Sequence, residues 1–433
     1  MSESQAVKVW DDPEPPARPL PDDGQVIDLR DRREAPPSGG REVAFVDLVA
    51  AHHDHREEIL AAMFGVMERG DFVLGQDLAE LEREFSAYCG SAHAVGVDSG
   101  FSALELILRA FDIGPGDEVI TPVNTFHATV RAIEATGARP VLVDADPISR
   151  NIDPSLIEPA ITTSTRAILP VHLYGQPADM KPINELARSH GLYVFEDACQ
   201  AHGSAHHDAR AGALADAAAF SFYPTKNLGA FGDAGMVVTR HDEIADRLRR
   251  LRNLGSSSKN QHDERGYNRR LDTLQAAVLR VKLRYLDAAN EARRRVAQWY
   301  EEALGDLDLT LPRIATWALP VFHLYVIEAD DRDTLADDLA EQGVHTGIHY
   351  PVPIHLQPAF RSLGLGPGTF PVSEVLAGRI LSLPMHPSMV PDEVDHVAEA
   401  IRRSRSRRAR RILTDVAGST ASGPPASPSQ HAG

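Results

Sequence analysis

The stretch "DEVITPVNTFHATVRAIEATGARPVLVDAD", residues 117–146, contains one complete structural repeat of the chain. It begins and ends with short runs of mainly apolar residues, 118–122 and 139–143. Such runs are typical of buried strands. Between them, residues 127–137 place apolar side chains at helical spacing and end at a glycine. A strand, a helix and a second strand in this order predict two parallel strands joined by a crossover helix.

The same order of elements recurs on both sides of this stretch. The apolar run "HAVGV" precedes the helical segment "SALELILRAF", and "RAILPVHLYG" precedes "MKPINELARSHG" and the run "LYVFEDA". This alternation predicts the α/β class, with a largely parallel sheet covered by helices on both faces. In such sheets the functional site lies beyond the carboxyl ends of the strands. Residues at the strand ends are therefore the candidates for a functional site.

The domain organisation follows from composition and periodicity. Residues 42–285 are predicted to form a large domain with an N-terminal segment, and residues 286–404 a smaller α+β domain. The run "LDTLQAAVLRVKLRYLDAANEARRRVAQWYEEAL" reads as a long helical bridge between them. Residues 1–41 and 405–433 are rich in Pro, Gly, Ser and charged residues, so both are predicted to be disordered tails.

Charge and cysteine content exclude several functional classes. The 62 Asp and Glu residues outnumber the 44 Lys and Arg residues, and the resulting charge of −18 would repel nucleic acids and anionic membranes. The Arg-rich run at 402–411 is therefore interpreted as the solvated end of a helix. Cys89 and Cys199 are too few for a disulfide framework and lack metal-site spacing, so we expect a cytoplasmic protein without a metal. No stretch has the length of a membrane helix, and the N-terminus resembles no signal peptide.

Lys226 lies in the segment "SFYPTKNLGAFGDAGMVVT", between two apolar runs that read as strands. A lysine is costly to bury, because the ammonium group loses its hydration unless it is paired or deprotonated. Three interpretations compete: a surface lysine in a loop, a ligand for an anion, or a desolvated amine that reacts with carbonyl groups.

Two other strand ends help to decide among them. In "VGVDSGFSALELIL" a strand passes through a Ser-Gly turn into a helix, whose first amides can hold a phosphate. The strand in "LYVFEDACQ" ends with Glu196 and Asp197, where a carboxylate is either a helix cap or a partner for a cationic ring nitrogen. A phosphate cradle, an anion for a pyridinium and a reactive amine together indicate pyridoxal phosphate (PLP).

The chain resembles the PLP-dependent sugar aminotransferases of the DegT/DnrJ/EryC1/StrS family, from about Val43 to about Ile401. The resemblance implies PLP fold type I, with a mostly parallel seven-stranded sheet sandwiched by helices and a smaller C-terminal domain. It also implies a homodimer with shared active sites. The motifs that carry it are "GDEVITPVNTF", "LPVHLYGQPADM", "VFEDACQAHG", "AAFSFYPTKNLGAFGDAG", "GYNRRLDTLQAAVLRVKL", "TGIHYPVPIHLQPAF" and "SLPMHP".

The resemblance also implies roles for individual residues. Lys226 matches the lysine that holds the cofactor through a Schiff base, and Asp197 matches the aspartate that pairs with the pyridine nitrogen. The remaining matches are Gln200 near the ring hydroxyl, Phe126 stacked on the ring, Gly100, Phe101, Ser102 and Ser221 at the phosphate, and Asn268 reaching the phosphate from the second subunit. Phe101 departs from the family, which usually has a threonine there; we expect PLP to bind still, with lower affinity.

Elementary chemistry agrees with these roles. The Asp197 carboxylate keeps the pyridine nitrogen protonated, so that the ring accepts electrons when a proton leaves the substrate carbon. The Lys226 amine, once displaced by the amino donor, can carry that proton between the substrate carbon and the cofactor. The same lysine is thus an anchor first and an acid-base group afterwards.

The family resemblance implies transfer of an amino group from L-glutamate to a keto group of a nucleotide-linked deoxysugar, through a pyridoxamine phosphate form. A dTDP-3-keto-6-deoxyhexose is the expected acceptor. The candidate substrate residues are Tyr174, His323, His349, Tyr350, His355 and Gln357, and a structural role is the alternative at each. Alternatives are a 4-keto sugar or cyclitol acceptor, a sugar dehydratase, in which histidine replaces the lysine, and a PLP-binding regulator without turnover.

Overall fold

The computed structural model describes residues 42–421 of the chain, with side chains to residue 407. The predicted tail at 1–41 lies outside this range. The last helix, α12 (Pro391–Ala421), continues past the boundary predicted at 404, so residues 405–421 differ from the expected disordered tail. The Arg- and Ala-rich sequence there consists largely of good helix formers. Residues 422–433 lie outside the described range.

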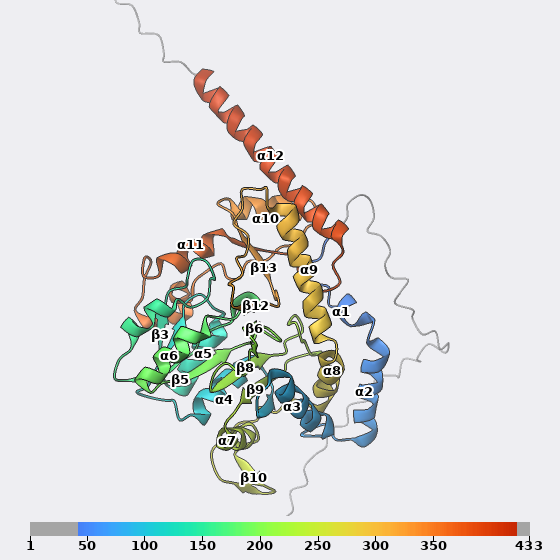
Figure 1. The fold of residues 1–433 in the computed structure, drawn as a ribbon, viewed down its shortest axis with the longest axis vertical. Coiled ribbons are helices and arrows are strands. Elements are labelled where there is room, and N and C mark those ends of the chain that lie inside the picture. Colours follow the sequence, from blue (N-terminus) through green and yellow to red (C-terminus); the bar gives the residue numbers. More distant parts are fainter. Residues whose placement is uncertain (1–41, 422–433) are drawn as a thin grey trace, which may run out of the picture. The chain divides into compact units, whose positions relative to one another are not determined.

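A seven-stranded sheet organises the fold, as predicted (Figure 1). Its spatial order is β1 (His93–Val97), β9 (Gly235–Thr239), β8 (Ala217–Ser221), β5 (Tyr193–Asp197), β4 (Thr165–Ile168), β2 (Glu118–Pro122) and β3 (Arg139–Val143). Strand β9 runs antiparallel to both of its neighbours, whereas the pairs β8–β5, β5–β4, β4–β2 and β2–β3 are parallel. The carboxyl ends of β1, β2, β5 and β8 therefore meet at one edge.

Helices cover both faces of this sheet because side chains alternate along each strand. On β8, Ala217 and Ala219 pack into one core, while Ala218 and Phe220 pack into the other. The first core contains α4 (Gly100–Ala110), α5 (His127–Thr136) and α7 (Asp242–Arg252). The opposite face carries α3 (Gln76–Cys89), α6 (Met180–His190) and α8 (Thr273–Leu283).

The C-terminal part has its own core around a two-stranded antiparallel sheet, β13 (Tyr325–Glu328) and β14 (Ile380–Leu383). Packed against it are α9 (Leu286–Leu304), α10 (Arg332–Ala340) and α12, and the rings of Tyr300 and Tyr325 stack 4.8 Å apart. This grouping is compatible with a division near residue 285, which stays a prediction.

The long helix expected over 271–304 is interrupted between α8 and α9. Tyr285 leaves the helix, its ring stacks on His55 at 3.6 Å, and its hydroxyl donates a 2.6 Å hydrogen bond to Glu58. These contacts with the N-terminal segment lie at the break, where the N–H groups of Arg284 and Tyr285 bond to the carbonyls three residues back, Val281 and Lys282. The sequence pattern alone, apolar at helical spacing on both sides, does not reveal them.

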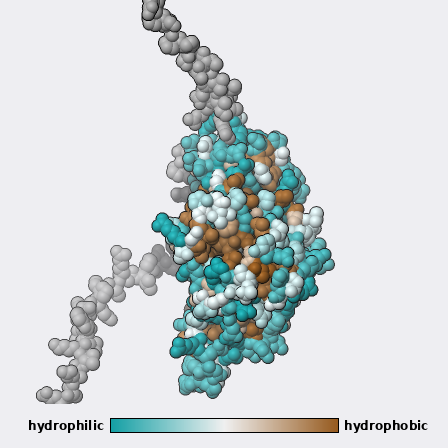
Figure 2. Space-filling view, turned by 90° about the vertical axis from the view of Figure 1, so that its left-hand side faces the viewer, coloured by the Kyte–Doolittle hydropathy of each residue, from teal (hydrophilic) through white to brown (hydrophobic). Residues whose placement is uncertain are grey.

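Smaller elements complete the description. They are α1 (Ala50–His53), α2 (Arg56–Arg69), α11 (Pro371–Arg379), β6 (Ala205–His206), β7 (Ala209–Arg210), β10 (Ser256–Ser258), β11 (Gln261–His262) and β12 (Ala318–Leu319). Figure 2 shows one face of the protein, on which hydrophobic residues gather midway between hydrophilic regions. Within the described range, no helix is long and apolar enough to cross a membrane. The cytoplasmic location stays a prediction from the sequence.

Candidate active site

A cavity of about 420 Å³ lies at the carboxyl edge of the large sheet, where the strand-end argument placed the site. Predicted residues that line it are Gly100, Phe101, Phe126, Asp197, Gln200, Ser221, Lys226, His323, His349 and Tyr350. Predicted residues that do not line it are Ser102, Tyr174, Asn268, His355 and Gln357. The cofactor residues of one subunit are thus largely brought together, whereas the substrate residues divide into two groups.

Lys226 is partly buried in the wall of this cavity, in the loop between β8 and β9. Its backbone N–H donates a 2.8 Å hydrogen bond to the Tyr223 carbonyl, which fixes the loop. Burial lowers the pKa of the Lys226 amine below its usual value, and the nearby Cys199 and Asp197 offset part of that effect. The geometry excludes a free surface lysine and favours an amine that is deprotonated more readily than usual.

Asp197 ends β5 and points into the same cavity. Its Oδ2 accepts a 2.7 Å hydrogen bond from Thr129 Oγ1, and its Oδ1 accepts a 3.2 Å bond from the Cys199 N–H. Thr129 Oγ1 lies 2.9 Å from Thr125 Oγ1, so a pair of hydroxyls supports the carboxylate. Within the described range, no arginine or lysine is close enough to Asp197 to form an ion pair. Its charge therefore remains available to a cationic ligand.

Glu196, the neighbouring candidate, has a structural role instead. Its side chain is fully buried, and its oxygens accept hydrogen bonds from His172 Nε2 at 3.0 Å and from the N–H groups of Gly212 and Leu214 at 2.8 and 2.9 Å. Successive residues of a strand point to opposite faces, so only one of the two adjacent carboxylates can reach the cavity. The structure assigns that position to Asp197.

The start of α4 and the end of β8 bring together hydrogen-bond donors that could hold a phosphate group. The first-turn N–H groups of Gly100 and Phe101 have no acceptor within the helix, and both residues line the cavity. Ser221 Oγ accepts a 3.3 Å bond from the Tyr223 N–H, which leaves its hydrogen free to donate. A Cβ on Gly100 would lie 2.6 Å from Ser221 Cβ, so the close approach requires glycine. These donors fit an anionic phosphate.

Ser102 does not line the cavity, and its predicted role as a phosphate ligand stays a prediction. Its Oγ is buried and receives hydrogen bonds from Ser99 Oγ at 3.0 Å and from Arg269 Nη1 at 2.6 Å. The Ser102 N–H in turn donates to Ser99 Oγ, which caps α4. The hydroxyl of Ser102 thus ties the helix start to Arg269, outside the cavity. The ring of Phe101 lies at the cavity wall, with the Arg269 guanidinium 5.7 Å from its centroid.

Aromatic and amide groups close the other side of the cavity. The Phe126 and Tyr350 rings are 5.6 Å apart between centroids, and Phe126 is 45% exposed, so its ring is available for stacking on a ligand. Gln200 Oε1 accepts a 2.7 Å bond from the Tyr174 N–H, and Gln200 Nε2 donates a 3.2 Å bond to the Tyr350 hydroxyl. Because the Tyr174 N–H can only donate, the Gln200 oxygen must face it, and the Gln200 NH₂ group is the donor to Tyr350. Burial raises the pKa of the Tyr350 hydroxyl.

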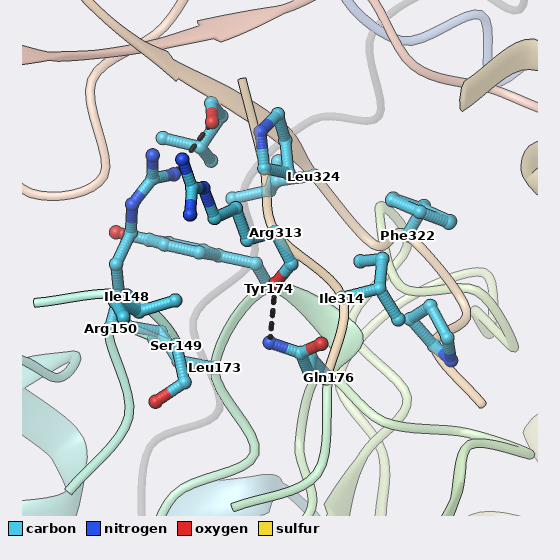
Figure 3. Close-up of a pocket in the computed structure, with 13 residues that line it drawn as sticks. Ile148, Ser149, Arg150, Leu173, Tyr174, Gln176, Arg313, Ile314, Phe322 and Leu324 are labelled. Carbon is cyan, nitrogen blue, oxygen red and sulfur yellow. Dashed lines mark hydrogen bonds between the residues drawn. The ribbon is translucent and has the colours of Figure 1, made fainter. Parts of the chain in front are cut away.

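Tyr174 supports the cavity from behind. Its hydroxyl donates a 2.5 Å bond to the His349 carbonyl, and its ring borders a separate pocket of about 30 Å³ with Arg150, Phe322 and Leu324 (Figure 3). Together with the bond from its N–H to Gln200, this contact links two parts of the cavity wall. Tyr174 is therefore a positioning residue in this structure, not a lining one.

His355 and Gln357 also hold the chain in place. His355 Nε2 lies 3.0 Å from Glu374 Oε1, with the His355 side chain fully buried, and Gln357 Nε2 donates a 3.2 Å bond to the Val352 carbonyl. Asn268 is exposed and forms an isolated bridge with Asn253, away from the cavity of its own chain. Its predicted contact with a second subunit stays a prediction.

Sequence reasoning missed several residues of the site. Thr129, Thr125 and Cys199 contact or flank Asp197, and Tyr223 and Asp233 line the cavity. The sequence does contain a pattern that could have identified Thr125 and Thr129. They are two hydroxyl residues spaced four apart, soon after the strand run 118–122, which places both near the carboxyl edge of the sheet. Within the described residues, no group of three or more His, Cys, Asp or Glu side chains has the arrangement of a metal site.

Comparisons with known proteins agree with this geometry. The sequence profile of the DegT/DnrJ/EryC1/StrS aminotransferase family matches residues 53–402. The erythromycin biosynthesis sensory transduction protein EryC1 of Saccharopolyspora erythraea is 50% identical over 83% of this chain and 99% of its own length. The dTDP-3-amino-3,4,6-trideoxy-alpha-D-glucose transaminase of Streptomyces venezuelae is 48% identical over 83% and 95%. The dTDP-3-amino-3,6-dideoxy-alpha-D-galactopyranose transaminase of Aneurinibacillus thermoaerophilus is 46% identical over 83% and 99%.

Solved structures show the same similarity. The crystal structure of S. venezuelae DesV in complex with a ketimine intermediate has a TM-score of 0.83 and 48% identity, and the match covers 84% of this chain and 98% of DesV. NtdA from Bacillus subtilis, solved with bound cofactor PMP, has a TM-score of 0.79 and 33% identity, with 85% and 86% covered. The protein therefore belongs to the DegT/DnrJ/EryC1/StrS aminotransferase family and is a PLP-dependent aminotransferase.

Proposed function

We propose that the protein transfers the amino group of L-glutamate to the keto group of a nucleotide-linked deoxysugar, most specifically a dTDP-3-keto-6-deoxyhexose. The observation that carries the proposal is the convergence of Lys226, Asp197 and the start of α4 on one cavity. The names of the relatives from S. venezuelae and A. thermoaerophilus, both dTDP-3-amino-sugar transaminases, support this acceptor class. Products of this kind are aminated deoxysugars.

The residues of this chain fit PLP at defined places. The N–H groups of Gly100 and Phe101 and the Ser221 hydroxyl would hold the phosphate, and the Asp197 carboxylate would hold the protonated ring nitrogen. Phe126 offers an exposed ring face for stacking. When bound, PLP supplies an electron sink for the carbon that loses a proton and carries the amino group between the two substrates.

Lys226 provides the acid-base group of the reaction in this proposal. Because burial lowers its pKa, a larger fraction of its amine is unprotonated near neutral pH than in an exposed lysine. An unprotonated amine both reacts with a carbonyl and accepts a proton from carbon. Thr129 and the Cys199 N–H meanwhile hold the Asp197 carboxylate in one orientation, so that its charge stays where a ring nitrogen would lie.

A panel of acceptors tests the proposal. The purified protein is incubated with PLP, L-glutamate and, in turn, dTDP-linked 3-keto-6-deoxy sugars, dTDP-linked 4-keto-6-deoxy sugars and keto-inositols. We expect 2-oxoglutarate to form fastest with a 3-keto sugar, and the amino sugar to be detected by mass spectrometry. Faster turnover of a 4-keto sugar or of a keto-inositol would contradict the proposed acceptor. Lys226→Ala is the negative control.

The name of EryC1, a sensory transduction protein, is the observation that favours a second function, regulation by PLP binding without turnover. The same panel separates the two functions. A regulator would bind PLP and give no 2-oxoglutarate with any acceptor, whereas the proposed aminotransferase gives 2-oxoglutarate with at least one.

We also propose that the protein acts as a homodimer. On α2, Leu60, Phe64 and Met67 share one face and are 54%, 58% and 59% exposed, which is an unusually apolar surface for a free helix. Asn268 is exposed and does not line the cavity of its own chain, as expected of a residue that contributes to the active site of the second subunit. Light scattering should give the mass of two chains, and Phe64→Glu should weaken the dimer.

Shared sites have a separate test. An equimolar mixture of Lys226→Ala and Asn268→Ala subunits, after exchange, contains heterodimers in which one site has both residues intact. If Asn268 serves the partner's site, the mixture should regain about a quarter of the wild-type activity. A mixture no more active than the two variants measured apart would contradict shared sites.

A further inference from the structure

The side-chain amide of Asn227, directly after Lys226, has a fixed orientation. Its Nδ2 donates hydrogen bonds to the Val321 carbonyl and to Asn290 Oδ1, both at 2.9 Å. Asn290 is itself oriented, because its Nδ2 donates a 2.8 Å bond to the His202 carbonyl. A backbone carbonyl can only accept hydrogen bonds. The NH₂ group of Asn227 must therefore face the Val321 carbonyl, and that of Asn290 the His202 carbonyl. Both hydrogens of Asn227 Nδ2 are used, and its Oδ1 remains as an acceptor.

This orientation decides the tautomer of His323. His323 Nδ1 lies 3.2 Å from Asn227 Oδ1, and an amide oxygen can only accept, so Nδ1 carries the hydrogen. Burial and the nearby Lys226 lower the pKa of His323 well below its usual value, so the ring is neutral. A neutral ring with hydrogen on Nδ1 has a bare lone pair on Nε2.

Within residues 42–421, the bare Nε2 nitrogen of His323 has no hydrogen-bond partner. Among the described residues, the hydrogen bond at Nδ1 is the only one of the His323 ring, and none joins Nε2 to Lys226. His323 lines the same cavity as Lys226, and the charge of Lys226 affects its pKa, so the two side chains are close. A ligand group that meets Nε2 therefore belongs to the part of the substrate near the reacting carbon.

We propose that His323 Nε2 accepts a hydrogen bond from a hydroxyl group next to the ketone of the sugar, and thereby selects acceptors that carry this hydroxyl. The inference rests on the proposed function, because it presumes a keto sugar as acceptor. A buried acceptor without a donor is unfavourable, so a site built in this way discriminates against an analogue that lacks the hydroxyl. Asn227 acts through His323 and is a positioning residue.

Substrate pairs make the inference testable. The ketones that correspond to a 3-amino-3,6-dideoxy sugar and to a 3-amino-3,4,6-trideoxy sugar differ at the hydroxyl on C4, and a 2-deoxy analogue tests the hydroxyl on the other side of the ketone. The kcat/KM ratio of the hydroxylated to the deoxy substrate is measured for the wild type and for His323→Phe. We expect the ratio for one pair to fall about tenfold in the variant, with the deoxy substrate changed less than about threefold.

His323→Gln is the matched variant, because its amide can offer an oxygen to the cavity, and it should keep part of the preference. The glutamate half-reaction, followed alone in a single turnover, should lose less in His323→Phe than the half-reaction with the hydroxylated sugar. An equal or greater loss with glutamate would overturn the inference, since the donor to Nε2 would then be the amino group of glutamate. Equal ratios in wild type and His323→Phe for both pairs would also overturn it, while amination itself would still support the proposed function.

Nuclear magnetic resonance gives a readout that needs neither cofactor nor turnover. In the cofactor-free protein labelled with ¹⁵N-histidine, the His323 signals, identified by their loss in His323→Phe, should show a protonated Nδ1 and a pyridine-type Nε2. Asn227→Leu should shift the tautomer equilibrium, and Asn227→Asp should restore a protonated Nδ1. A protonated Nε2 in the wild type would overturn the inference. Failure of the wild type to aminate any sugar would instead overturn the proposed function, and this inference with it.

Discussion

Thr129 Oγ1 donates a 2.7 Å hydrogen bond to Asp197 Oδ2, joining the first turn of α5 to the end of β5 across the carboxyl edge of the sheet. Both side chains are buried, so the bond is not weakened by competition with water. The second carboxylate oxygen accepts from the Cys199 N–H. The carboxylate is thereby fixed on two sides while its charge still faces the cavity.

Replacement of Thr129 by valine should reduce catalysis without unfolding the protein. Hydrogen bonds to charged groups contribute about 1.5–3 kcal/mol, so loss of this bond should lower kcat about 10- to 100-fold if it serves mainly to orient Asp197. Thr129→Ser keeps the hydroxyl and should retain most of the activity. Initial rates of 2-oxoglutarate formation measure both variants. Equal rates for Thr129→Val and wild type would show that Asp197 needs no such support.

The lowered pKa of Lys226 predicts how stability depends on pH in the cofactor-free protein. In the unfolded chain this lysine titrates near its ordinary value of 10.5, and in the folded protein it titrates lower. Between these two values the unfolded state binds more protons, so the free energy of unfolding contributed by Lys226 rises with pH. Below the pKa of Lys226 in the folded protein, the amine is charged in both states, and the folded state is destabilised by the full free energy of burying the ammonium group.

Lys226→Met removes this cost and keeps the size of the side chain. The variant should therefore have a higher Tm than the wild type at pH 7.5, and the difference should shrink as the pH approaches 10.5. Calorimetry of both cofactor-free proteins over this range provides the measurement, and titration of other groups cancels in the difference. A Tm difference that does not change with pH would show that the amine is not desolvated.

Glu196 and Asp197 should respond in opposite ways to the same change of carboxylate to amide. In Glu196→Gln, an NH₂ group must face one of the N–H groups or His172, which leaves buried donors without acceptors at a cost of about 1–3 kcal/mol. The Tm should fall by a few degrees while kcat of the folded enzyme stays within about threefold. Asp197→Asn should lower the Tm less, because the Thr129 hydroxyl can turn toward Thr125 and accept from the new NH₂ group, and it should lose most of its activity. Comparable loss of activity in both variants would contradict the division of roles.

The topology and the residues that line the cavity at the strand ends were predictable because they follow from local patterns. The short apolar runs and the strand-helix-strand order of residues 117–146 predict a parallel sheet, and such a sheet brings its strand ends together. Asp197, Ser221 and Lys226 stand at or just after strand ends, so one rule locates them all. The family resemblance then supplied their individual roles, and the cavity contains them.

The roles of the other residues depend on the orientations of their side chains, which cannot be derived from their spacing in the sequence. Ser102 follows Phe101 in the same helical turn, yet its hydroxyl points to Arg269, and Arg269 lies 167 positions away in the chain. Tyr174 supports the cavity wall through its backbone N–H and its hydroxyl, which bond to Gln200 and His349, while its ring borders the separate small pocket. Such outcomes depend on tertiary partners, which is also why the break at Tyr285 could not be read from helical periodicity.

Phe101 lines the cavity at the start of α4, beside the groups proposed to hold the phosphate, at a position where the family usually has threonine. Phe101→Thr adds a hydroxyl at the start of α4, and one additional hydrogen bond of about 0.5–1.5 kcal/mol should tighten PLP binding about 3- to 10-fold. Absorbance titration of the cofactor-free protein at low temperature measures the Kd. Ser102→Ala is the matched control: because its hydroxyl is held by Ser99 and Arg269, it should lower the Tm and change the Kd less than about threefold. A Kd that weakens strongly in Ser102→Ala and stays unchanged in Phe101→Thr would place the phosphate on the hydroxyl of residue 102 instead.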